Sequence, residues 1–142
     1  MDNKLTNGNL RIIKNNSTYW EFIREVRNHS DIKTGFIEQG YITKETHENY
    51  MAQYGSDYII CLYNDFPAGF AGSINGDIRV ATHPDFLRNG VARKLISSIR
   101  ERNPSSIAKI KIDNLASLEL FKKCGFQIKY YLLEADSSIN ND

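Results

Sequence analysis

The chain has 142 residues, of which 41% are hydrophobic and 25% charged, so it is long enough for one globular domain with a sizeable core. Its formal net charge is +1, which excludes a general charge excess as the basis for binding nucleic acid or an anionic membrane. It has two cysteines, an N-terminus unlike a signal peptide and no apolar run of about 18 residues, so we expect a cytoplasmic protein without a disulfide framework, a metal site or a membrane span.

Strand and helix patterns alternate along the chain between two polar ends. Residues 1–9 and 136–142 are expected to lack order, so one domain spans residues 10–135. An Asn-Asp pair at 64–65 and an Asn-Gly pair at 75–76 separate three apolar segments, which predicts an antiparallel meander. The expected elements, in chain order, are a strand at 10–13, helices at 18–28 and 44–54, strands at 58–63, 66–74 and 77–82, a helix at 90–102, a strand at 107–112, a helix at 114–124 and a strand at 126–134.

The last part of this order indicates the fold class. A strand-helix-strand unit that follows an antiparallel meander produces a mixed sheet with helices on its faces. We therefore expect an α/β (α+β) fold. Among its helices, the first is expected to begin with a capping box of Thr18 and Glu21, and the second with Thr43 as its N-cap.

The segment from Val80 to Arg93 carries the clearest functional signal. There a strand ends, a turn containing Gly90 follows and a helix begins. The first amides of a helix have no partner within it and lie at the positive end of its dipole, so a turn that aims several of them at one point is an anion site. Glycine lets the backbone approach a ligand closely, Ala92 keeps the next contact small, and Arg88 adds positive charge. Taken alone, the glycine is more typical of an ordinary turn before a helix.

The wider pattern resembles motif A of the GNAT superfamily of N-acetyltransferases, which reads Q/R-x-x-G-x-G/A after a strand. Gly90 and Ala92 match its last two fixed positions, whereas Leu87 stands where the family has glutamine or arginine. The resemblance implies the GNAT fold, a mixed, mostly antiparallel sheet of about six or seven strands flanked by about four helices. It also implies that backbone amides of the turn bind the diphosphate of coenzyme A.

Residues 113–126 resemble motif B of the same family, N-x-x-A/S-x-x-L-Y/F-x-x-x-G-F. Asn114 matches the asparagine that hydrogen-bonds the coenzyme in the family, and Phe121 matches the aromatic position. Each alone is more typical of an ordinary helix N-cap or of core packing, but together, at this distance after motif A, they support the resemblance. The coenzyme-binding residues expected on this basis are Val80, Ala81, Thr82, Leu87, Arg88, Asn89, Gly90, Val91, Ala92, Arg93, Asn114 and Phe121.

The resemblance implies direct transfer of the acetyl group from acetyl-CoA, a co-substrate, to an amine bound beside it. We expect the Val80 amide to donate a hydrogen bond to the carbonyl oxygen of the thioester. Many family members use a motif B tyrosine as the acid, but this chain has Phe121 there, so Tyr130 is the candidate acid, although it is more typical of sheet packing. Glu45 is the candidate base, although it is also typical of a solvated helix face. Further candidate bases are His29, Glu38, His47 and His83.

These features together predict an acetyl-CoA-dependent N-acetyltransferase that acts on a primary amine. An amino sugar is the first candidate acceptor and a peptide or protein amine the second; Arg27 would meet a phosphate of a nucleotide-linked sugar, or is simply a helix surface charge. Leu87 and Phe121 also leave open a coenzyme-binding module without turnover, and an unrelated α/β protein with a chance turn is a third reading. No metal, nucleic acid or membrane partner is expected, and the protein is expected to be a monomer or a homodimer.

Overall fold

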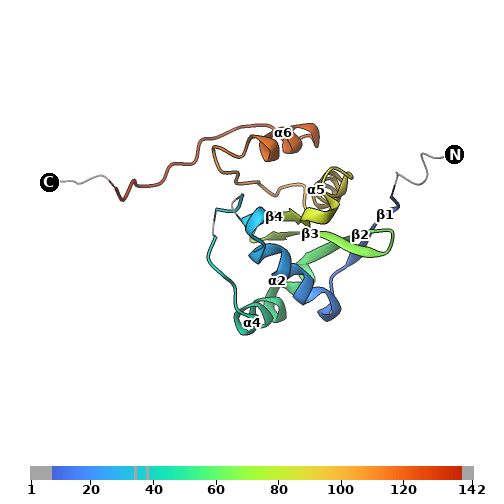
Figure 1. The fold of residues 1–142 in the computed structure, drawn as a ribbon. Coiled ribbons are helices and arrows are strands. Elements are labelled where there is room, and N and C mark those ends of the chain that lie inside the picture. Colours follow the sequence, from blue (N-terminus) through green and yellow to red (C-terminus); the bar gives the residue numbers. More distant parts are fainter. Residues whose placement is uncertain (1–7, 34, 38, 139–142) are drawn as a thin grey trace.

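The computed structural model describes residues 8–33, 35–37 and 39–138, and its centre is a four-stranded antiparallel sheet with helices on both faces (Figure 1). The strands pair in sequence order and are β1 (Leu10–Lys14), β2 (Tyr58–Tyr63), β3 (Phe66–Ile74) and β4 (Asp77–Thr82). The helices are α2 (Trp20–Asn28), α3 (Ser30–Lys33), α4 (Lys44–Tyr54), α5 (Val91–Arg102) and α6 (Leu115–Lys123), with short 3-10 turns η1 (Ser17–Tyr19), η2 (Gly55–Asp57) and η3 (Pro84–Phe86).

The meander of β2, β3 and β4 confirms the expectation from the two turn signals. Asn64 and Asp65 have φ of 48° and 70°, and Asn75 and Gly76 have φ of 53° and 84°. Two consecutive residues with positive φ match the twist of the flanking strands, which is why such pairs close two-residue hairpins.

The sheet separates two hydrophobic cores. Ile59 and Cys61 of β2 face the core that α5 covers, whereas Tyr58 and Ile60 face the core beneath α2 and α4. Because both faces are covered, β2 reads as a continuous apolar run and not as an alternating one.

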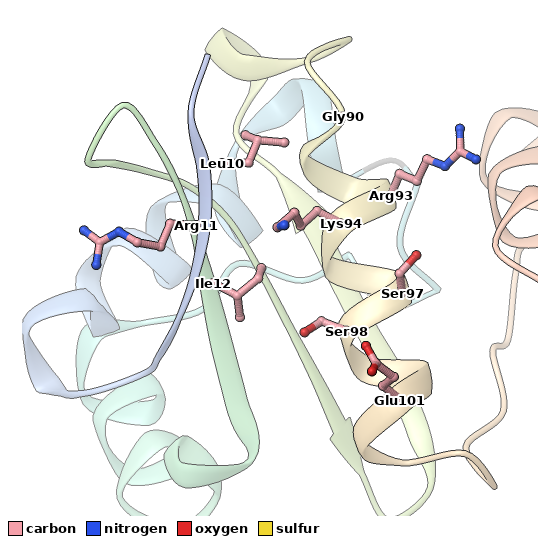
Figure 2. A pocket seen from close by; sticks show the side chains of 9 residues that line it. All are labelled: Leu10, Arg11, Ile12, Gly90, Arg93, Lys94, Ser97, Ser98 and Glu101. Carbon is pink, nitrogen blue, oxygen red and sulfur yellow. The ribbon is translucent and has the colours of Figure 1, made fainter. Parts of the chain in front are cut away.

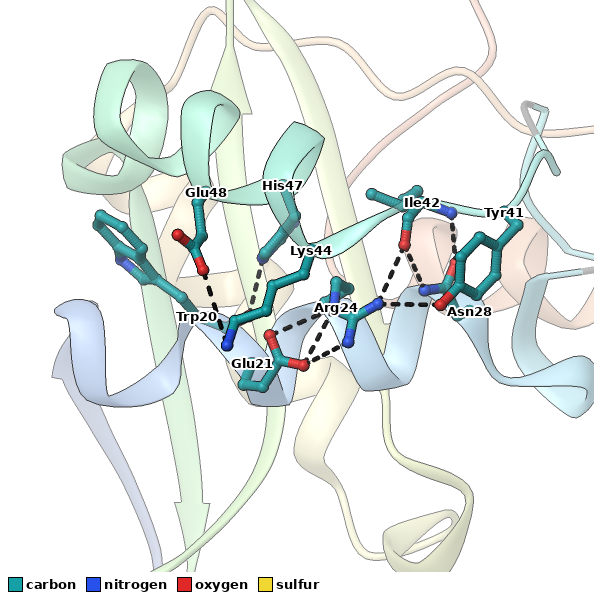
Figure 3. A network of polar contacts seen from close by, with 9 residues as sticks. All are labelled: Trp20, Glu21, Arg24, Asn28, Tyr41, Ile42, Lys44, His47 and Glu48. Carbon is teal, nitrogen blue, oxygen red and sulfur yellow. Dashed lines mark hydrogen bonds and ion pairs between the residues drawn. The ribbon is translucent and has the colours of Figure 1, made fainter.

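Polar contacts fix the segment that joins α2 to α4 (Figure 3). The Asn28 side chain donates to the Ile42 carbonyl oxygen at 2.9 Å and accepts from the Ile42 amide at 2.8 Å. Arg24 donates to the same carbonyl and also contacts Tyr41 and Glu21. Because Glu21 binds Arg24, the expected capping box is absent.

The N-termini of α2 and α4 are capped in different ways. The Asn16 side chain accepts from the Thr18 amide at 2.9 Å, so Asn16 caps η1, which leads directly into α2. The Thr43 hydroxyl accepts from the Thr46 amide, so the cap expected for α4 is confirmed. None of the helices in the described ranges is long and apolar enough to cross a membrane.

The expected strands at 107–112 and 126–134 are not formed in the described part of the chain. Ile107 makes a single parallel bridge to Asp77, and the chain then leaves β4. Phe126 still packs against the core, and residues 127–138 extend away from the body of the molecule (Figure 1). An extended segment becomes a strand only where its main chain meets a partner, and neither segment has one along its length. The described residues therefore contain four strands and five α-helices, where about six or seven strands and about four helices were expected.

Candidate active site

The outer edge of β4 is open beyond its first residues. The Ile78 amide donates to the Ile107 carbonyl at 2.9 Å, on the edge opposite β3, whereas the His83 amide donates to Ala68 on the β3 side. Amides of alternate residues in a strand face the same edge, so Val80 and Thr82 direct their amides to the same outer edge as Ile78. No described residue pairs with them there.

The turn between β4 and α5 presents a run of unbonded amides. The amides of residues 88–93 donate to no acceptor in the described part of the chain, and the first bonded amide of α5 is that of Lys94. Arg88 and Gly90 have φ of 66° and 81°, and such left-handed residues turn successive amides toward a common concave side. Asn89 braces the turn because its side-chain amide donates to the carbonyls of Phe86 and Leu87.

Gly90 has a conformational reason to be glycine, while its close approach to a ligand stays a prediction. An added Cβ would meet Leu10 Cδ1 of β1 at 3.6 Å, an ordinary contact. The positive φ is therefore the reason for glycine at this position, since a side chain there is strained by about 1–2 kcal/mol.

A large cleft runs along the open edge of β4. Its volume is about 910 Å³; residues from both sides of β4 line it, and the two sides meet where the Asn114 side chain lies 3.5 Å from the Gly35 carbonyl oxygen. One end is lined by the starts of α5 and α6 and by residues 108–111, and the other by α2, α3 and residues 35–37. The open strand edge and the first helical residues of α5 thus share one cleft.

Thr82 contributes a buried hydroxyl to this cleft. The residue is 7% exposed and lines the cavity, yet its hydroxyl has no hydrogen-bond partner among the described residues. Two further buried polar atoms lack partners, on Asn15 and His47, but neither residue lines the cleft. Buried polar atoms in folded proteins are almost always bonded, so the Thr82 hydroxyl indicates a place for a ligand atom.

A sequence model of the acetyltransferase (GNAT) family matches residues 18–126, a span that includes β4, the turn and α6. The chain belongs to the GNAT family. Among curated proteins no relative matches the sequence.

Solved GNAT structures share the fold at low sequence identity. The protein yncA from Salmonella typhimurium, solved with its cofactor acetyl-CoA, is 21% identical with a TM-score of 0.71, over 86% of this chain and 82% of that one. A spermidine N-acetyltransferase from Vibrio cholerae, solved with CoA and spermine, is 17% identical with a TM-score of 0.74, over 89% and 85%. The aminoglycoside N-acetyltransferase AAC(6')-Iy, solved with CoA, is 16% identical with a TM-score of 0.68, over 93% and 97%.

Most residues that the GNAT motifs indicate lie in or beside the cleft. Asn114 accepts from the Ser117 amide at 3.2 Å and so caps α6, while its side-chain nitrogen lies 3.5 Å from the Gly35 carbonyl oxygen. Phe121 is 4% exposed and packs edge-on against Phe126. The expected coenzyme-binding residues that line the cleft are Val80, Ala81, Thr82, Leu87, Ala92, Asn114 and Phe121.

Gly90 and Arg93 instead line a second cavity, of about 680 Å³, between β1 and α5. Figure 2 shows Ile12 of β1 pointing toward α5 and Lys94 pointing back toward β1. Arg93 extends from α5 away from β1 in the same view.

The candidate acid and base lie outside the cleft. Tyr130 is 86% exposed on the extended C-terminal segment, and Glu45 is exposed in the first turn of α4. Neither lines either cavity, so their catalytic roles stay predictions.

The histidines proposed as bases are engaged elsewhere, and Glu38 lies outside the described residues. His83 Nδ1 accepts from the Asp85 amide, and its Nε2 lies 3.3 Å from Glu25. His29 accepts from the Asp31 amide. His47 is buried against the Trp20 carbonyl, and burial lowers its pKa.

Three features of the cleft could not be identified from the sequence. One is the orphaned Thr82 hydroxyl, since the sequence predicted only a backbone role there. The others are the side chains of Arg79 and Asp31, which line the end beside α2 and α3. The three residues line one cleft only because the fold leaves the outer edge of β4 unpaired there.

Proposed function

We propose that the chain transfers the acetyl group of acetyl-CoA to a primary amine of a small molecule. The observation that carries the proposal is the run of unbonded amides at residues 88–93 beside a cleft whose wall is the open edge of β4. An amino sugar is the first candidate acceptor and a peptide amine the second. The similarity to solved GNAT structures supports the fold of this chain, and it does not identify the amine that this chain would acetylate.

The turn is the proposed binding site for the coenzyme diphosphate. Unpaired amides at a helix N-terminus carry partial positive charge, and the helix dipole adds to it. Arg88 and Arg93 supply full charges beside them. The pantetheine arm then follows the open edge of β4, where the amide and the hydroxyl of Thr82 need partners.

The proposed reaction is a direct attack of the neutral amine on the thioester carbonyl carbon. A C–N bond forms, the C–S bond breaks, the amine loses one proton and the sulfur leaves as the coenzyme thiol or thiolate. The carbonyl oxygen gains negative charge on the way, and we assign the Val80 amide as the donor that stabilises it.

Proton transfer in this proposal does not depend on a motif B tyrosine. Phe121 has no proton to give, and the Tyr58 phenol is 2% exposed and hydrogen-bonded to Tyr50 at 2.7 Å. Burial raises the pKa of Tyr58, so this phenol is a weaker proton donor than an ordinary tyrosine. Water in the cleft is therefore the simplest carrier for the protons of the amine and the thiolate.

Two measurements on the full chain test this function. Coenzyme A should raise the melting temperature, since saturation at about a hundred times Kd stabilises a protein by about 2.7 kcal/mol. Acetyl-CoA with a panel of amines should release thiol in an amine-dependent manner. Stabilisation without release for any amine would leave a binding module, and the absence of both would contradict the proposal.

A further inference from the structure

The part of the cleft lined by α2, α3 and residues 35–37 lies on the α2 side of β4, away from the proposed diphosphate site, and we call it the acceptor end. Ile78 and Val80 pack into the core under α5, whereas Ala81 packs into the core under α2 and α4. By the alternation of a strand, Arg79 shares the face of Ala81. Arg79, an exposed residue, therefore lines the cleft on the side of α2, where Arg27 of α2 and Asp31 of α3 also line it.

The two arginines of this end have no carboxylate partner. Neither Arg27 nor Arg79 makes a hydrogen bond or an ion pair with the described residues. Arg27 is half-buried, and its guanidinium carbon lies 5.8 Å from the centroid of the Tyr50 ring. Both arginines lie near Tyr58, because Arg79 and Tyr58 both pair with Gly72 of β3, and Tyr58 is hydrogen-bonded to Tyr50, over whose ring Arg27 lies.

The other charges of the cleft are balanced. Lys109 lies 3.1 Å from Asp77, and Lys111 lies 3.9 Å from Asp113. Asp31 is exposed, and its carboxylate has no partner among the described residues. The acceptor end thus holds two uncompensated cations and one uncompensated anion in the described part of the chain.

This arrangement fits a ligand that carries both charges. A guanidinium binds a carboxylate or a phosphate through two parallel hydrogen bonds, and a carboxylate binds an ammonium. We propose that the acceptor is an amine bearing a carboxylate or phosphate group, with its anion between Arg27 and Arg79 and its amine near Asp31. This inference rests on the proposed function and narrows its substrate class.

The same charges disfavour a polycation. Spermine, which is bound in the Vibrio cholerae structure of similar fold, would bring several positive charges toward two unpaired guanidiniums. The proposal therefore predicts that polyamines are poor acceptors for this chain.

Matched pairs of amines test the inference by thiol release from acetyl-CoA. Glucosamine 6-phosphate is compared with glucosamine, phenylalanine with phenylalaninamide, and spermidine serves as the polycation. We expect at least one anionic member to exceed its neutral partner in kcat/KM by tenfold or more. The pair that shows the preference identifies phosphate or carboxylate as the recognised group.

Variants then assign the preference to the arginines. Arg79→Gln should remove most of it, lowering kcat/KM for the anionic amine about tenfold and leaving that of its neutral partner unchanged. Arg27→Gln should act in the same direction, and Arg102→Gln, at an exposed site on α5, is the matched control. Equal rates within both pairs, a preference for spermidine, or equal losses for both members in Arg79→Gln would overturn the inference.

Calorimetric binding separates this inference from the proposed function. Glucosamine 6-phosphate and glucosamine are titrated into wild-type protein and into Arg79→Gln, with and without coenzyme A. Tighter binding of the phosphate, lost in the variant, supports the anion site even if no amine is acetylated. Equal binding of both sugars contradicts it even if coenzyme A binds and thiol is released.

Discussion

At the scale of single residues, Thr82 shows how a binding site costs stability in the free protein. Its hydroxyl is buried in the wall of the cleft without a partner in the described residues. An unsatisfied buried polar group costs about 1–3 kcal/mol, and a ligand that supplies the missing hydrogen bond recovers that free energy. The Thr82 hydroxyl therefore lowers the stability of the free protein and strengthens its binding of the coenzyme.

Thr82→Val tests this link because valine has nearly the same shape. We expect the free energy of unfolding of the free protein to rise by about 1 kcal/mol, since the orphaned hydroxyl is gone. The Kd for coenzyme A should rise about three- to tenfold for the same reason. Thermal unfolding and calorimetry measure the two effects.

Thr82→Ser is the control, because it keeps the hydroxyl and removes only a methyl group. Its coenzyme affinity should stay near that of the wild type. A Thr82→Val protein that is less stable and binds the coenzyme normally would show that the hydroxyl has no ligand role.

The residues of the candidate site differ in how far the sequence reveals them. Gly90 and Ala92 were identified because a turn and a helix start depend on neighbours in the chain. The Thr82 hydroxyl and Arg79 could not be, since their significance depends on the missing partner along β4, which is a tertiary feature. The positive φ of Gly90 is a second reason for glycine that only the structure reveals, and its approach to a ligand stays a prediction.

At the scale of elements, the backbone amides of β4 point alternately toward β3 and toward the cleft. The amides of odd-numbered residues face β3 and hold the sheet together, whereas those of Val80 and Thr82 face the cleft. A substitution at Val80 can therefore remove a cleft donor without removing a bond of the β3–β4 ladder.

Val80→Pro is the sharpest test of the proposed oxyanion donor, because proline lacks the amide hydrogen. We expect kcat to fall about 100- to 1000-fold, as is usual when one such donor is lost. The Kd for coenzyme A and the melting temperature should remain close to those of Val80→Ala, the control that keeps the amide. A proline variant as active as the alanine variant would rule out this role for the Val80 amide.

Helices and hairpins could be predicted from the sequence where residues close together in the chain determine them. Positive-φ pairs fixed both hairpins, and Thr43 fixed the start of α4. Residues 107–112 and 126–134 carry strand-like sequence, but their state depends on a partner that neither segment meets. The start of the first helix was missed because Glu21 binds Arg24 and Asn16 provides the cap.

At the scale of the whole molecule, the groups proposed to bind the coenzyme and those proposed to bind the acceptor lie on different sides of β4. The side of β4 toward α5 and α6 offers amides and a buried hydroxyl, and the side toward α2 and α3 offers unpaired charges. Because both ends belong to one cleft, a coenzyme and an acceptor can meet at Val80 without any movement of the sheet.

The central claim, that the amides of residues 88–93 bind the coenzyme diphosphate, is tested most directly by their NMR resonances. Isotope-labelled protein is titrated with coenzyme A and, separately, with pantetheine, which lacks phosphate. We predict that coenzyme A shifts the amide resonances of residues 88–93 and that pantetheine leaves them unchanged while it shifts those of Val80 and Thr82. Saturation with coenzyme A that leaves the amides of residues 88–93 unmoved would contradict the account.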